Sequence, residues 1–135
     1  MSTRVAGLLL FLLSPSIAMA TDLQVTDSQG TVVVVKEAAV DYGSMLSPDA
    51  DKDGIRIQQG DAAVRVKWSE VQSLSITKVD SSVKPARIEL EVVMVSGTRA
   101  PGTLLRKGAM TLTGKAPLGE YSISLERVRR ITPVR

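Results

Sequence analysis

The strongest constraint on the fold of this chain is a two-residue alternation of branched apolar and polar side chains. The pattern is clearest in GIRIQQ (54–59), AVRVK (63–67) and RIELEVV (87–93). Because successive side chains of a strand point to opposite faces, this alternation predicts β-strands with one buried face each. No stretch combines helix length with helix-capping residues. The chain is therefore predicted to be all-β, with nine or ten short strands.

The N-terminal segment has the composition of a signal peptide rather than of a folded element. Arg4 precedes the apolar run VAGLLLFLL (5–13), and Ala18-Met19-Ala20 has the A-x-A form of a cleavage site. A membrane span needs about 20 apolar residues, so this run is too short to be one, and no later segment is long enough. Residues 1–20 are therefore predicted to be removed on export, which places the protein in a periplasm or outside the cell.

The remaining chain is predicted to hold two β units, residues 22–80 and residues 86–135. It contains no cysteine, so its core must be stable without disulfides. Residues 22–80 carry ten acids and six bases, whereas residues 81–135 carry four acids and ten bases. The basic half either binds an anionic partner or complements the acidic half of the same chain.

An internal repeat supports this division. VRVKWSEVQSL (64–74) matches YSISLERVRRI (121–131) at an offset of 57 residues. Both segments have apolar residues at two-residue spacing and then at three-residue spacing. The change of period predicts a strand, one turn of 3₁₀ helix that buries a valine (Val71 and Val128), and a second strand.

A strand, a single helical turn and a final strand form the closing element of SH3-like and Sm-like barrels, and both segments resemble that class of small β-barrel. The resemblance implies two tandem SH3-like barrels, with one β-sandwich built from the duplicated halves as the alternative. It lies at the level of the fold and implies no ligand. Trp68 matches Leu125 in the repeat, which favours a core position over an exposed ligand platform.

Two further segments carry predictions about the sheet. VVVV (32–35) is a continuous apolar run, which is expected of a strand covered on both faces. Pro101 lies within TRAPGTLLRKG (98–108) and cannot donate a ladder hydrogen bond, so this segment is predicted to be an edge strand.

The stretch SPDADKDGIRI (47–57) contains the clearest candidate for a metal site. Asp49, Asp51, Asp53 and Gly54 match D-x-D-x-D-G, the first half of an EF-hand loop. The closing glutamate of an EF-hand is absent, because position 12 is Gly60. Two hypotheses stay open: a calcium loop completed by another carboxylate such as Asp61 or Glu70, and a solvated turn.

The composition excludes most catalytic chemistry. The chain has no histidine and no cysteine, which excludes Ser-His-Asp triads, thiol nucleophiles and Cys- or His-ligated zinc. Glu89 and Glu91 share a face of one strand, and we assign them to its solvent side rather than to a catalytic pair. We therefore expect no enzyme.

Basic residues cluster at Arg106-Lys107 and at Arg127, Arg129 and Arg130. The latter three are the candidate site for an anionic surface. Proteins that bind single-stranded nucleic acid pair such charge with stacking aromatic residues. The C-terminal half contains only Tyr121, so a nucleic-acid partner is not expected.

The leading hypothesis is an exported, non-enzymatic β module that binds another envelope or secreted protein or an anionic surface. The second is a structural domain stabilised by calcium at Asp49, Asp51 and Asp53, and the third is an enzyme without histidine or cysteine.

Overall fold

The computed structural model describes residues 21–43, 49–84, 86–104 and 110–135, and it confirms the all-β prediction. The described part contains eleven strands and two single-turn 3₁₀ helices. They are β1 (Leu23–Asp27), β2 (Val32–Asp41), β3 (Ala50–Asp51), β4 (Gly54–Gln59), β5 (Ala62–Lys67), η2 (Trp68–Glu70), β6 (Val71–Asp80), β7 (Arg87–Met94), β8 (Arg99–Leu104), β9 (Thr111–Ala116), β10 (Gly119–Ser124), η3 (Leu125–Arg127) and β11 (Val128–Pro133). The predicted signal peptide lies outside the described residues.

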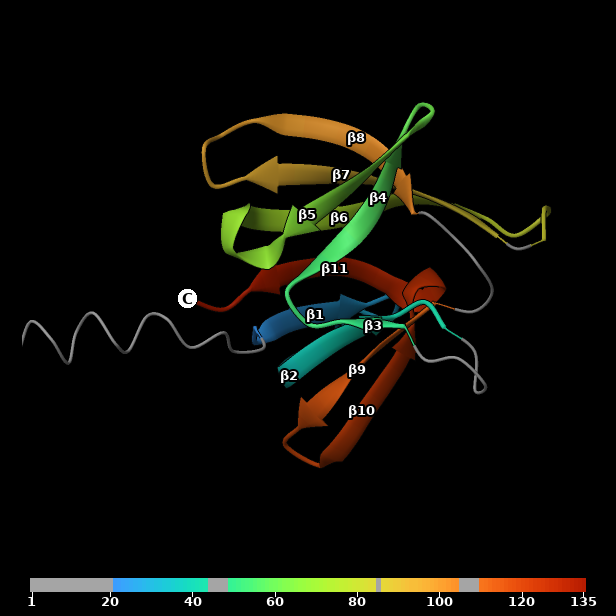
Figure 1. Ribbon diagram of the computed structural model, residues 1–135. Helices are drawn as coiled ribbons and strands as arrows, with labels where there is room; N and C mark the ends of the chain where they lie inside the picture. The colour runs from blue at the N-terminus through green and yellow to red at the C-terminus, as the bar shows by residue number, and fades with distance from the viewer. Residues whose placement is uncertain (1–20, 44–48, 85, 105–109) are drawn as a thin grey trace, which may run out of the picture.

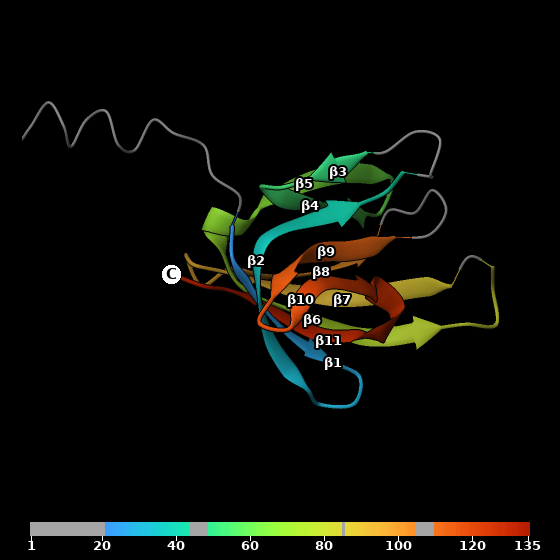
Figure 2. The same ribbon diagram turned by 90° about the horizontal axis from the view of Figure 1, so that it is seen from below.

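All strands belong to one antiparallel sheet that curls around a shared core (Figures 1 and 2). The strand order is β10-β9-β2-β1-β11-β6-β7-β8-β4-β5, and the short β3 pairs with β2. Strands from residues 22–80 alternate in space with strands from residues 86–135, because β2 pairs with β9 and β4 pairs with β8. The two predicted units therefore contribute to one continuous sheet.

The structure confirms the two predicted 3₁₀ turns. Each follows a strand, and each ends where the next strand begins, at Val71 and at Val128. Both valines are buried, at 0% and 2% exposure. Trp68 and Leu125, which open the two turns, are also in the core. Three-residue spacing therefore identified a real change from strand to helical turn.

The two matched segments meet at the centre of the sheet. Strands β6 and β11 pair there, and the register places Leu74 opposite Ile131, which is the same position of the 57-residue match. The strand order is symmetrical about this ladder: β7 and β1 flank it, then β8 and β2, then the hairpins β4–β5 and β9–β10. This symmetry is what a duplication would produce, and the duplication itself stays a prediction.

A second match, which the sequence reasoning missed, links the two hairpins beside that central ladder. LQV (23–25) and LEV (90–92) are each followed by a turn that contains a glycine with positive φ, 89° at Gly30 and 95° at Gly97. In both turns the glycine N–H donates to the carbonyl three residues earlier, at 3.0 and 2.9 Å. Each glycine turn joins the two strands of an antiparallel hairpin, β1–β2 and β7–β8.

The run VVVV is not covered on both faces, so that prediction was wrong. Val35 is fully buried, but Val32 and Val34 are 54% and 39% exposed. The reason is that β2 lies in a single curled sheet, whose concave face forms the core and whose convex face meets solvent. Composition alone could not distinguish this strand from one between two layers.

The edge position predicted for the Pro101 segment was also wrong, because β8 lies between β7 and β4. The ladder between β8 and β4 is short, however, and includes only Thr103 and Leu104 of β8. Pro101 therefore lies where β8 has one neighbour, and its missing N–H leaves no ladder bond unmade.

One cluster of buried side chains fills the concave side of the sheet. Its members come from both ends of the strand order, and the largest fully buried ones are Trp68, Leu23, Ile55, Leu74, Ile88, Leu90, Leu112, Leu125 and Ile131. Glu89 and Glu91 alternate with the buried Ile88, Leu90 and Val92 of β7, as predicted. Apart from Trp68 and Tyr42, the core is therefore aliphatic, and it is built without cysteine or histidine.

Candidate functional site

The first candidate is the acidic loop, residues 49–54, which contains β3 and leads into β4. Asp49 accepts two hydrogen bonds from the Arg56 guanidinium, at 2.7 and 2.9 Å. Asp51 accepts two from Arg65, at 2.8 and 2.7 Å. The loop is thus joined to β4 and β5 by two forked arginine–carboxylate pairs, a geometry that suits guanidinium and carboxylate groups.

Asp51 is the buried member of these pairs. Its side chain is 7% exposed, whereas that of Arg65 is 42% exposed. The hydrogen bonds from Arg65 lower the pKa of the Asp51 carboxyl, although burial acts in the opposite direction. The Asp53 N–H adds a bond to Asp51 at 3.1 Å. Both carboxylate oxygens of Asp51 therefore already accept hydrogen bonds.

These contacts do not fit a calcium loop. Calcium needs several carboxylate or carbonyl oxygens aimed at one point, and the described residues contain no group of three acidic side chains that could hold an ion. An ion would have to displace Arg56 from Asp49 and Arg65 from Asp51. Calcium binding stays an untested prediction, and the sequence reasoning missed both arginines because each lies on a later strand.

Tyr42 supports the first of these pairs. Its ring lies under the Arg56 guanidinium, 4.6 Å from ring centroid to guanidinium carbon, which is a cation–π arrangement. Its hydroxyl accepts the Arg56 backbone N–H at 2.7 Å. Burial raises the pKa of Tyr42 to about 12. The end of β2 is thereby fixed to β4.

The second candidate is the arginine face, which we define as Arg127, Arg129 and Arg130. Arg127 ends η3, and the other two follow in β11. The pairing of β1 with β11 shifts so that Thr26 is opposite Arg130 and Asp27 is opposite Val128. Arg129 is thus the extra residue of a β-bulge, and for this reason two consecutive arginines are both exposed.

The arginine face lacks a carboxylate partner, unlike three arginines elsewhere in the sheet. Arg56, Arg65 and Arg99 each form a salt bridge with a carboxylate. Within the described residues, none of the three arginines of the arginine face does so. Arg129 instead donates to the Ser28 carbonyl at 3.0 Å.

The carboxylate nearest to the arginine face along the β1–β11 ladder is occupied elsewhere. Asp27 accepts the backbone N–H groups of Gln29 and Thr31, at 2.9 and 3.0 Å. It therefore holds the β1–β2 turn rather than an arginine. The other predicted basic pair, Arg106-Lys107, lies outside the described residues.

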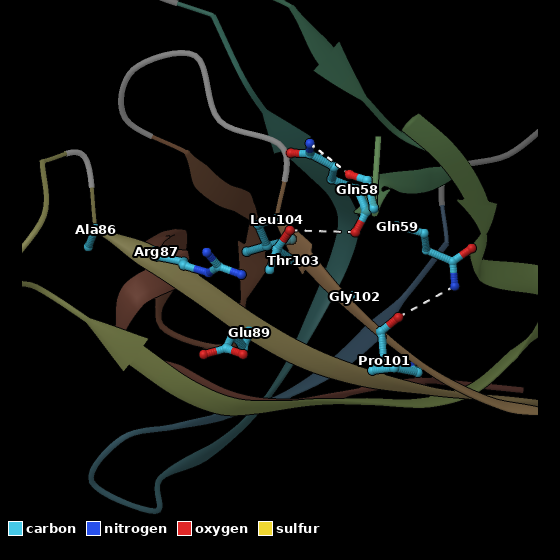
Figure 3. Close-up of a pocket in the computed structure, with 10 residues that line it drawn as sticks. Gln58, Gln59, Ala86, Arg87, Glu89, Pro101, Gly102, Thr103 and Leu104 are labelled. Carbon is cyan, nitrogen blue, oxygen red and sulfur yellow. Dashed lines mark hydrogen bonds between the residues drawn. The ribbon is translucent and has the colours of Figure 1, made fainter. Parts of the chain in front are cut away.

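An open cleft of about 780 Å³ lies on the outer side of β4, β7 and β8 (Figure 3). Arg87 and Glu89 project into it from β7 beside Thr103. The Thr103 hydroxyl donates to the Gln58 carbonyl at 3.5 Å, rather than to a base. The cleft offers polar contacts, and its groups do not form a nucleophile–base pair.

Comparisons with protein-family models, curated proteins and solved structures find no match to this chain. In the described ranges, no helix has the length and apolar character needed to cross a bilayer.

Proposed function

We propose that this protein is an exported, non-enzymatic β module that binds an anionic component of the cell envelope through its arginine face. One observation carries the proposal: three exposed arginines lie together on η3 and β11 without a carboxylate partner among the described residues. Guanidinium groups bind phosphate, sulfate and carboxylate groups through paired hydrogen bonds.

The local structure favours binding over simple solvation. The bulge brings Arg129 and Arg130 to the surface together, and the bond from Arg129 to Ser28 limits the freedom of one guanidinium. A partly ordered side chain loses less entropy when it binds. Tyr121 is the only aromatic residue after position 80, so a single-stranded nucleic acid would find few stacking partners.

The non-enzymatic part of the proposal rests on composition and on the cleft. The chain contains no histidine and no cysteine, and the Thr103 hydroxyl in the cleft is bonded to a backbone carbonyl. Export rests on the N-terminal sequence. Its test is the mass of the protein recovered from the envelope or medium, which should correspond to a chain that begins at Thr21.

Binding can be tested by sedimentation with vesicles that contain an anionic lipid and with vesicles that do not. A basic residue near an anionic surface contributes about 1 kcal/mol. The triple variant Arg127→Ser, Arg129→Ser, Arg130→Ser should therefore bind roughly 100-fold more weakly, and wild-type binding should fall as salt is added. An immobilised sulfated polysaccharide, used in parallel, distinguishes a glycan from a lipid headgroup.

A matched control removes the same charge elsewhere. Lys36, Lys52 and Lys84 are exposed, and replacing all three with serine lowers the net charge equally. If this control loses as much binding as the arginine triple variant, net charge and not the arginine face is responsible. Equal binding of the arginine variant and the wild type to every anionic surface would disprove the proposal.

A further inference from the structure

Strand β5 is one of the two ends of the sheet, and its outer edge is open. Among the strands that the structure describes, it pairs with β4 alone. Five of its six residues are exposed, and Val64 is 38% exposed. An open edge presents unpaired backbone groups to solvent and is a template for another strand.

The hairpin geometry shows which backbone groups of β5 point outward. Gln59 pairs with Ala62 across a two-residue turn, so this pair is hydrogen-bonded and every second residue after it also bonds to β4. In agreement, the next even-numbered residue after β5, Trp68, donates its N–H to the Asp53 carbonyl at 2.8 Å. The backbone groups of odd-numbered residues such as Ala63 and Arg65 therefore point away from β4.

The charges at the two ends of this edge are complementary. Asp61 immediately precedes β5, and Lys67 ends it. Both are exposed, and within the described residues neither forms a salt bridge. Their positions differ by six, an even number, so continuing the strand alternation to Asp61 places both on the same face.

We propose that β5 pairs antiparallel with β5 of a second copy of this chain, about a two-fold axis at Val64. This register places each Lys67 opposite Asp61 of the other copy and uses the full length of the strand. The outward groups of Ala63 then bond to those of Arg65 in the other copy. Val64 faces its own equivalent, which buries two exposed apolar side chains.

Other registers of the same edge are less favourable. An axis at Arg65 would place two guanidinium groups opposite each other, and like charges in directly opposed positions are destabilising. An axis at Ala63 would leave Lys67 without a partner. Of these registers, only the two-fold register at Val64 places both Asp61 and Lys67 opposite a side chain of opposite charge.

The other end of the sheet, β10, is the competing partner for β5. Pairing β5 with β10 of another copy could bring Lys67 opposite Glu120, but it forms one such contact and not two. Glu120 also lies near Lys115, whose pKa it helps to raise. Such a head-to-tail contact adds further copies in a ring or a filament, whereas the two-fold contact ends at a dimer.

The apolar residues of β5 also favour a second copy of this strand as the partner of the edge. Val64 and Val66 line a pocket of about 150 Å³ on the concave face, together with Met94 and Ala100. The part of this lining that β5 contributes, Val64 and Val66, belongs to the strand that would receive the second copy. Dimer formation would therefore cover apolar surface as well as pair the edge. This inference is independent of the arginine face.

The test is the mass of the purified protein by light scattering over a concentration series. We expect the mass to approach twice that of the monomer as concentration rises. Asp61→Lys should raise the dimer dissociation constant about tenfold, because two attractive contacts become repulsive. The double variant Asp61→Lys, Lys67→Asp should restore the wild-type value, because it exchanges the two charges.

Two further variants separate the alternatives. Ala63→Pro removes an outward N–H while keeping the bonds to β4, so it should abolish the dimer, and the fluorescence of Trp68 reports whether the variant is folded. Glu120→Lys should leave the dimer unchanged. A protein that stays monomeric at every concentration would overturn the inference. So would an assembly that Glu120→Lys weakens and Asp61→Lys leaves intact, since that result identifies β10 as the partner.

Discussion

The ion pair between Arg65 and Asp51 is predicted to be the most costly charged contact to break. In Arg65→Met the apolar part of the side chain is kept and the guanidinium is lost, so Asp51 stays buried with a charge that only backbone N–H groups can partner. Removing one partner of a fully buried pair costs about 3–5 kcal/mol, and an exposed pair contributes about 0–1 kcal/mol. Asp51 is 7% exposed and Arg65 42%, so we expect a loss of about 2 kcal/mol.

The loss can be measured by urea unfolding followed by the fluorescence of Trp68. This residue is the single tryptophan of the chain, and it is fully buried. For a domain of this size, a loss of that order corresponds to a fall in the melting temperature of about 7 °C. The matched control is Arg99→Met, because Arg99 and Glu91 are 69% and 44% exposed and 3.5 Å apart. The control should cost less than about 0.5 kcal/mol.

The pH dependence provides an independent check. The pKa of Asp51 is lowered in the folded chain, so its stabilisation is present above the unfolded pKa of about 3.9 and is lost as the pH falls through the folded value. In Arg65→Met the buried carboxyl protonates more readily. The difference in unfolding free energy between the wild type and Arg65→Met should therefore become smaller as the pH falls from about 7 to about 3. If Arg65→Met loses no stability at neutral pH, or loses only as much as Arg99→Met, the reasoning is refuted.

Four shorter predictions follow from other parts of the structure. Val71→Ala and Val128→Ala should each cost about 1–3 kcal/mol in unfolding experiments, and a cost at one site only would show that the two turns are not equivalent. Gly54→Ala should lower stability by about 2 kcal/mol or more, because a Cβ there would overlap the Val66 carbonyl; a variant as stable as wild type would contradict this. Tyr42 should ionise near pH 12 in an absorbance titration, and because its folded pKa is raised, the stability it contributes is lost as the pH rises from about 10 toward that value. Calcium, compared with EDTA, should leave the melting temperature unchanged, because arginines hold two carboxylates of the acidic loop; a shift would show that the ion displaces them.

The candidate sites were predictable to different degrees. The arginine face was visible in the sequence as a cluster, since its members are within four residues of one another. Its lack of partners was not visible, because it depends on Asp27 being occupied by its own turn. For the acidic loop the sequence left a calcium site and a solvated turn open, because aspartates at alternate positions have the same spacing in a calcium loop and in a loop held by arginines.

The sequence by itself determined the local features of this protein: which residues alternate and where a strand changes into a 3₁₀ turn. These features depend on side chains a few residues apart, so Val71, Val128 and Trp68 could be assigned to the core without coordinates. The tertiary structure alone decided which strands are neighbours. Alternation fixes the face to which a side chain points but not the strand beside it. For this reason the exposed valines of β2, the interior place of β8, the arginine partners of the acidic loop and the open edge of β5 became visible only in the folded chain.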